Sequence, residues 1–84
     1  MGSIDKLIRK LQSVPADFKY SELKRVLEAF GYTEDAGGKT SGSYVCFKHS
    51  EFAPISLHKP HPGDEVKKYT INYVIKLLKE REQI

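Results

Sequence analysis

The segment from residue 37 to residue 48, GGKTSGSYVCFK, combines glycines with hydroxyl side chains and a lysine. Consecutive backbone N–H groups in such a loop can form a concave anion site, and hydroxyl and lysine side chains commonly contact phosphodiesters. The same composition also suits an ordinary hairpin loop, so both interpretations remain open at this point. The candidate phosphate contacts in this segment are Lys39, Thr40, Ser41 and Ser43.

The Gly-Lys-Thr triplet at residues 38–40 superficially matches a nucleotide-binding P-loop. That motif requires a glycine five positions before Gly38, where Thr33 stands. It also requires a helix after the loop, whereas alternating strand-like residues follow here. The sequence therefore argues against NTP binding by this loop.

Histidine suits acid–base chemistry near neutral pH, and all three histidines lie between residues 39 and 68. His58 and His61 border the proline-rich loop KPHPG, whereas His49 falls in an expected turn, where we expect it to be solvated. The same interval holds five lysines against three acidic residues, which favours an anionic ligand. Beyond Lys39, the candidate phosphate-binding lysines are Lys48, Lys59, Lys67 and Lys68.

The single cysteine, Cys46, excludes a disulfide within the chain. It falls inside an alternating strand pattern, so we expect an inert side chain rather than a catalytic thiol. The cysteine and the histidines do not form a recognisable zinc spacing, and His58-x-x-His61 is a weak signal. We therefore predict no metal and no other cofactor.

The length of 84 residues predicts one domain with a small core. Charged residues make up 30% of the chain, and no apolar run approaches the ~20 residues of a membrane-spanning helix. Charges interrupt the apolar residues between Ile4 and Leu11, so the pattern does not match a signal peptide. We expect a cytoplasmic protein without a membrane partner. The net charge of +3 is too modest to identify a nucleic-acid partner by itself.

Hydrophobic periodicity predicts three helices. Apolar residues recur at helical spacing in residues 3–13, 19–30 and 68–82. Val14-Pro15 should end the first helix, because proline disfavours helical backbone in the residue before it. Gly31 should end the second helix in a left-handed conformation.

Residues 32–36, 43–48 and 54–58 read as strands. In the second strand, Val45 and Phe47 share one face, and Tyr44 shares the other face with Cys46. A turn at residues 49–51 would place Tyr44 near His58 across the strands. The predicted fold is α+β: a three-stranded antiparallel sheet packed on helices, with one face of the sheet exposed to solvent.

Three segments resemble the HicA family of RNA-cleaving toxins from toxin–antitoxin pairs: YSELKRVLEAFGY, TSGSYVCFKH and ISLHKPHPGDEVKKYTINYVIKLL. The resemblance covers most of residues 20–78, and its most specific piece surrounds the His-Pro-Gly residues. It implies a double-stranded-RNA-binding-domain-like fold, helix–three strands–helix, in residues 19–84. Residues 1–18 would then form an additional N-terminal helical extension.

The resemblance further implies metal-independent cleavage of mRNA, blocked by a HicB-like antitoxin. Family members usually carry a catalytic histidine shortly after the Gly-Ser pair, but Tyr44 follows Gly42-Ser43 here. Tyrosine, with an ordinary pKa of about 10, can donate a proton or stack on a base but is a poor general base. The catalytic candidates are therefore Tyr44, His58 as a substitute base, and His61, which could instead fix its loop.

Three explanations of Tyr44 remain open. Tyr44 stacks on RNA while His58 or His61 supplies the base, the protein binds single-stranded RNA without cleaving it, or the histidine was replaced in a detoxified lineage. A different alternative is a protein-interaction module, in which the basic residues attract an acidic partner. RNA affinity that falls steeply with salt distinguishes the RNA-binding alternatives from the last one.

Overall fold

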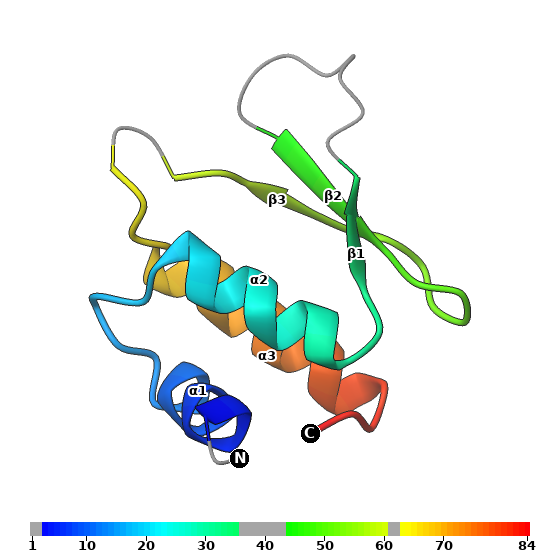
Figure 1. Cartoon of the computed structure of the whole chain (residues 1–84), viewed down its shortest axis with the longest axis horizontal. Helices are drawn as coiled ribbons and strands as arrows, with labels where there is room; N and C mark the ends of the chain where they lie inside the picture. Colours follow the sequence, from blue (N-terminus) through cyan, green and yellow to red (C-terminus); the bar gives the residue numbers. More distant parts are fainter. Residues whose placement is uncertain (1–2, 36–43, 61–62) are drawn as a thin grey trace.

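The structure is a computed structural model that describes residues 3–35, 44–60 and 63–84. It contains three helices and three strands in the described residues (Figure 1). The predicted α+β fold is confirmed, and the element order is consistent with a double-stranded-RNA-binding-domain-like arrangement preceded by one extra helix. In chain order the elements are α1 (Ser3–Gln12), α2 (Tyr20–Ala29), β1 (Thr33–Asp35), β2 (Tyr44–Lys48), β3 (Ile55–His58) and α3 (Lys68–Glu80).

The strands form one antiparallel sheet in the order β1-β2-β3. Glu34 pairs with Phe47 in the first ladder, and Phe47 pairs with Ile55 in the second. Because side chains alternate along a strand, this register gives the sheet a buried face and an open face. The buried face carries Val45, Phe47, Ile55 and Leu57, all at most 4% exposed.

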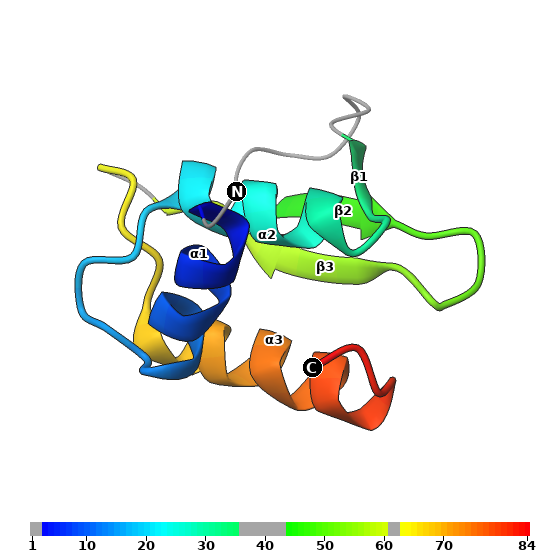
Figure 2. The ribbon, with the colours of Figure 1, turned by 60° about the horizontal axis from the view of Figure 1, so that its bottom comes forward.

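Helices α2 and α3 lie side by side beneath the sheet, and α1 lies on the opposite side of this helix pair (Figures 1 and 2). Buried side chains of the core therefore lie both between the sheet and the α2–α3 pair and between this pair and α1. From α1 and the segment after it, Leu11 and Phe18 are both fully buried. They join a core whose helical members are Leu23, Val26, Leu27, Ile71, Val74 and Leu78.

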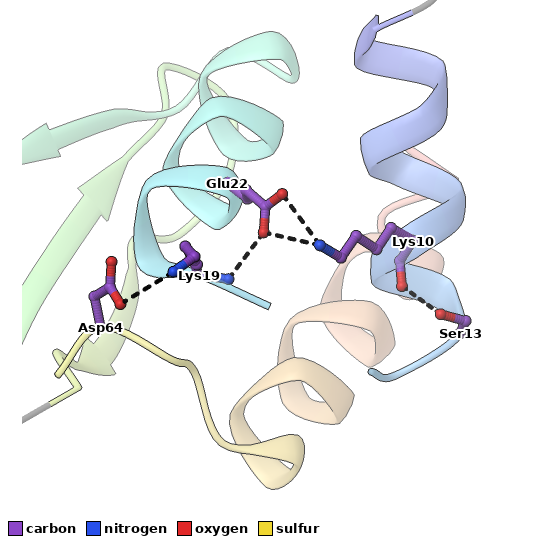
Figure 3. Close-up of polar contacts among 5 residues, drawn as sticks. All are labelled: Lys10, Ser13, Lys19, Glu22 and Asp64. Atoms are coloured by element: carbon purple, nitrogen blue, oxygen red, sulfur yellow. Dashed lines mark hydrogen bonds and ion pairs between the residues drawn. The ribbon is translucent and has the colours of Figure 1, made fainter. Parts of the chain in front are cut away.

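Polar contacts also join α1 to α2 (Figure 3). The Nζ atom of Lys10 donates to both carboxylate oxygens of Glu22, at 3.3 and 3.2 Å. The same carboxylate accepts the backbone N–H of Lys19 at 3.0 Å, which satisfies one free donor at the start of α2. The backbone N–H of Lys19 and the nearby ammonium of Lys10 together hold the pKa of Glu22 below its usual range.

Backbone hydrogen bonds join the segment before α3 to the segment before α2. The Val66 N–H donates to the Phe18 carbonyl, and the Tyr20 N–H donates to the Asp64 carbonyl, both at 2.7 Å. Lys19 and Glu65 form the antiparallel bridge between these two bonds. Both helices therefore begin at the same end of the molecule.

Several predicted boundaries shift by one or two residues. α1 ends at Gln12, with Val14 in a left-handed conformation at a φ of 52°. α3 ends at Glu80 instead of residue 82, because Glu82 has a φ of 60° and leaves the helical path. Pro54 precedes β3, whereas the predicted strand residues Ala36 and Ser43 lie outside the described residues.

His49 is half-buried and hydrogen-bonded, so the prediction that it is solvated is wrong. Its Nδ1 accepts the Glu51 N–H at 2.9 Å, and its Nε2 lies 3.0 Å from the Phe30 carbonyl oxygen. A neutral ring with its proton on Nε2 satisfies both bonds. The ring also packs against Tyr32 and Phe52, with centroids 4.7 and 4.8 Å apart. The turn after β2 is therefore attached to the end of α2.

Gly31 permits this attachment, and we expect Gly31→Ala to destabilise the fold. Its φ is +97°, and an added Cβ would lie 2.8 Å from the Nε2 of His49. Left-handed backbone costs a residue with a Cβ about 1–2 kcal/mol, and displacing the imidazole adds to that cost. Thermal unfolding should show a loss of at least about 4–8 °C in Tm.

Gly63→Ala is the matched control for this measurement. Gly63 has a φ of +89° but no atom within 4 Å of an added Cβ, so its substitution carries the backbone cost alone. The difference between the two variants measures the contact with His49. Equal losses of stability in both would show that the His49 contact contributes nothing.

Candidate functional site

Tyr44 and His58 lie together on the open face of the sheet, as the alternation of β2 and the turn after it predicted. They are direct partners in the β2–β3 ladder, and their ring centroids are 4.1 Å apart with a 44° tilt. Tyr44 is 52% exposed, and His58 is also exposed. The pair therefore offers solvent a hydroxyl, an imidazole and two aromatic surfaces at one position.

The rest of the open face is mostly polar. Cys46 lies between Asp35 and Ser56 across the three strands, and Thr33 pairs with Lys48. The thiol is half-buried and is not among the groups that form hydrogen bonds in the described part of the chain. The proposed inert role of Cys46 stays a prediction.

Lys48 faces the same side as Tyr44 but is already paired. Its Nζ lies 2.8 Å from the Asp35 carboxylate, and this hydrogen bond raises the pKa of Lys48. The pair is well exposed, and exposed ion pairs contribute little stability in water. A phosphate could therefore compete with Asp35 for Lys48. It would gain less binding free energy there than at an unpaired lysine, because the ion pair with Asp35 must first be broken.

Lys59 does not join Tyr44 and His58 on the open face. Its Nζ lies 5.5 Å from the centroid of the Tyr20 ring, on the helical side of the sheet. The Tyr20 hydroxyl donates to Glu34 at 2.7 Å, and the Nζ of Lys24 lies 2.9 Å from the same carboxylate. Lys59 is thus positioned at the rim of the sheet by an aromatic and acidic cluster.

The Tyr20–Glu34 contact was not predicted from the sequence. Burial and the carboxylate beside it raise the pKa of the Tyr20 hydroxyl, which stays a proton donor. The hydrogen bonds from Tyr20 and Lys24 hold the pKa of Glu34 below its usual range. Glu34 is therefore an anion that attaches β1 to α2 and lies close enough to Lys59 to interact with its charge.

The other candidate residues are dispersed or lie outside the described residues. Lys67 and Lys68 are exposed at the start of α3, where Lys67 is the residue that precedes the helix. Within residues 3–35, 44–60 and 63–84, no group of three or more His, Cys, Asp or Glu side chains could hold a metal ion. The candidates outside the described residues are Lys39, Thr40, Ser41, Ser43 and His61.

Residues 20–79 match the family model described as the HicA toxin of bacterial toxin–antitoxin systems. The chain belongs to the HicA toxin family. It is therefore a toxin of a toxin–antitoxin system, for which the family implies an antitoxin partner. Comparison with curated proteins and with solved structures gives no match.

In this HicA toxin the matched residues include α2, the three strands and α3 up to Lys79, but not α1. Tyr44 and His58 lie inside it, so the ring pair belongs to the family region. The division into residues 1–18 and 19–84 stays a prediction, although Leu11 of α1 is part of the common core. None of the helices in the described ranges is long and apolar enough to cross a membrane.

Proposed function

We propose that this HicA toxin binds single-stranded mRNA on the open face of its sheet and cleaves it without a metal ion. The observation that carries the proposal is the Tyr44–His58 pair, with ring centroids 4.1 Å apart on an exposed face. An unpaired base can stack on an exposed aromatic ring, and a phosphodiester beside that base would then lie near the imidazole.

Cleavage without a metal requires one group to remove a proton and another to supply one. The ribose 2′ oxygen attacks the neighbouring phosphorus while the bond to the 5′ oxygen breaks, which leaves a 2′,3′-cyclic phosphate and a 5′ hydroxyl. His58 takes the 2′ proton as general base. The Tyr44 hydroxyl lies beside it and can protonate the leaving oxygen. His61 is a further catalytic candidate, and this role stays a prediction from the sequence.

The absence of histidine at position 44 favours a second candidate function, RNA binding without cleavage. Tyr44 keeps the stacking surface but replaces the usual base of the family. Under this alternative, the toxin acts by occupying single-stranded mRNA, and His58 contributes only its aromatic face. Measured cleavage by the purified chain separates the two candidates.

We further propose that a HicB-like antitoxin neutralises the toxin in the cytoplasm by covering the open face. The exposed rings and the lysines around the sheet form a surface suited to an acidic partner. Coverage of Tyr44 would exclude RNA directly, without any change in the fold of the toxin.

Lysines near the sheet should set the salt dependence of RNA binding. We expect Lys48→Gln/Lys59→Gln to weaken affinity for an unpaired oligouridine and to reduce the slope of log K against log salt. The slope should fall by about 0.7 for each phosphate contact that is lost. Fluorescence anisotropy titrations over a range of salt concentrations provide this measurement.

The charge-matched control is Lys6→Gln/Arg9→Gln, which removes two exposed positive charges from α1, the helix on the other side of the α2–α3 pair from the sheet. This variant should keep the original slope. If both double variants change affinity and slope equally, RNA binding follows net charge alone and the proposed surface is wrong.

A further inference from the structure

The outer face of α3 exposes two tyrosine rings. Tyr69 is 67% exposed and Tyr73 is 44% exposed, and with Tyr44 they are the exposed large hydrophobic side chains of the described residues. Residues four apart on a helix lie on the same side, one turn from each other. The opposite side of α3 is buried through Ile71, Val74 and Leu78. Tyr69 and Tyr73 therefore form an aromatic row on the solvent side.

The other tyrosines have partners within the fold. The hydroxyl of Tyr20 donates to Glu34, that of Tyr32 donates to Gln83, and the ring of Tyr44 packs on His58. In the parts of the chain that the structure describes, neither Tyr69 nor Tyr73 makes a hydrogen bond or a ring contact. Their rings are available for a ligand outside the chain.

Lysines surround this row. Lys68 precedes Tyr69, and Lys76 continues the row about one turn beyond Tyr73. Both lysines are exposed, and Lys79 lies on the same solvent side. Glu80 is the only acidic residue within α3. The face therefore combines flat aromatic surface with positive charge, which fits a ligand that carries both planar groups and anions.

We propose that the outer face of α3 is a second contact surface for single-stranded RNA, in which bases stack on Tyr69 and Tyr73 while Lys68 and Lys76 contact phosphates. This inference rests on the proposed RNA binding and extends it beyond the sheet. Surfaces that bind unpaired strands combine stacking rings with a basic path for the backbone, and stacking tolerates any base.

The pattern favours RNA over a protein groove. A helix that docks in a groove presents apolar anchors at successive turns, at spacings such as i, i+3, i+4 and i+7. Here the row begins with Tyr69 and Tyr73 but continues with Lys76, and Asn72 precedes Tyr73 in the sequence. Two stacking positions flanked by cations fit a nucleic-acid strand better than an apolar pocket.

The two surfaces belong to different layers of the molecule. Tyr44 and His58 lie on the sheet, whereas Tyr69 and Tyr73 lie on the helical layer (Figure 2). The molecule measures 35 × 31 × 23 Å along its principal axes. A strand of about 16 nucleotides spans ~54 Å even at a stacked spacing of ~3.4 Å, so it can reach both surfaces.

The experiment measures the affinity of the full chain for an oligouridine of about 16 nucleotides. We expect Tyr69→Ala/Tyr73→Ala to weaken binding by about 30- to 10⁴-fold, the range that follows from the loss of base stacking on two rings. Tyr69→Phe/Tyr73→Phe keeps both rings and should bind almost as tightly as the original chain. Asn72→Ala, a change at an exposed neighbour of Tyr73 in α3, should also leave affinity unchanged.

A duplex RNA of the same length distinguishes stacking from general attraction, because its bases are not available to the rings. Its affinity should not change in Tyr69→Ala/Tyr73→Ala. Equal weakening of duplex and single strand would overturn the stacking proposal. All substituted positions are exposed, and unchanged thermal unfolding would verify that each variant keeps the fold.

The outcomes separate this inference from the proposed function. If Tyr44→Ala weakens oligouridine binding but Tyr69→Ala/Tyr73→Ala does not, the sheet surface stands and the α3 surface is overturned. If the original chain binds no oligouridine, both proposals are overturned. If the α3 variant keeps RNA affinity but loses affinity for the co-expressed antitoxin, the face binds protein, and the RNA proposal is overturned.

Discussion

His58→Ala should slow RNA cleavage by about 10²–10⁴-fold, the range that a general base typically contributes. The imidazole packs against Tyr44 on an exposed face, so its removal should leave the core intact. RNA affinity should change far less than the cleavage rate, because the Tyr44 ring and the lysines remain. The assay follows a labelled RNA by gel electrophoresis in the presence of a chelator.

Tyr44→His tests the same site by adding a general base instead of removing one. The original chain should cleave slowly, since tyrosine occupies the position where HicA toxins usually carry their base. Restoring histidine should raise the rate while RNA affinity stays similar. Ser56→Ala, on the same face of β3, is the matched control and should leave the rate unchanged.

Rapid cleavage by both the original chain and His58→Ala would contradict the role of His58. If none of the variants cleaves and all of them bind RNA, the toxin is an RNA-binding protein without nuclease activity. In that outcome Tyr44 and His58 remain stacking residues of the surface. Antitoxin binding would then regulate occupancy of mRNA instead of its cleavage.

Leu11→Ala should destabilise the whole domain by about 2–5 kcal/mol, as expected for a leucine truncated in a packed core. Leu11 is fully buried although α1 lies outside the residues that match the HicA family. A chain of this size loses about 4–8 °C in Tm for each kcal/mol. Differential scanning calorimetry should therefore show a loss on the order of 10–40 °C.

Gln12→Ala is the neighbouring control, because Gln12 is exposed at the end of the same helix. Its effect should stay within about 0.5 kcal/mol. If Leu11→Ala melts at the same temperature as Gln12→Ala, α1 does not stabilise the core. Residues 1–18 would then behave as a separable extension.

The pairing of Tyr44 with His58 could be predicted because it follows from local rules. Strand alternation put Tyr44 on the other face of the sheet from the buried Val45. The short turn after β2 then made His58 the partner of Tyr44 in β3. Helices were equally predictable, since each has a continuous apolar stripe. Their ends were less predictable: α3 ends at Glu80 and Glu82 has left-handed backbone, which the apolar pattern does not indicate.

The position of Lys59 could not be predicted, because its direction depends on a contact between distant residues. Its ammonium lies over Tyr20, whose hydroxyl is held by Glu34. No local pattern links a residue at the start of α2 to one in β1. His49 was misjudged for the same reason: its partner carbonyl belongs to Phe30, at the end of another element.

The antiparallel contact between residues 18–20 and 64–66 has a consequence for how the chain folds during synthesis. Phe18 and Val66, which share a 2.7 Å backbone hydrogen bond, are separated by roughly 50 residues, and a ribosome adds about 5–20 residues per second. Val66 is therefore synthesised ~2–10 s after Phe18, and their hydrogen bond cannot form earlier. Because α3 supplies Ile71, Val74 and Leu78 to the core, α1 and α2 cannot complete their packing before the last helix is made. The toxin thus acquires its finished surface only after α3 has been made, and an antitoxin already present can bind each new molecule from that moment.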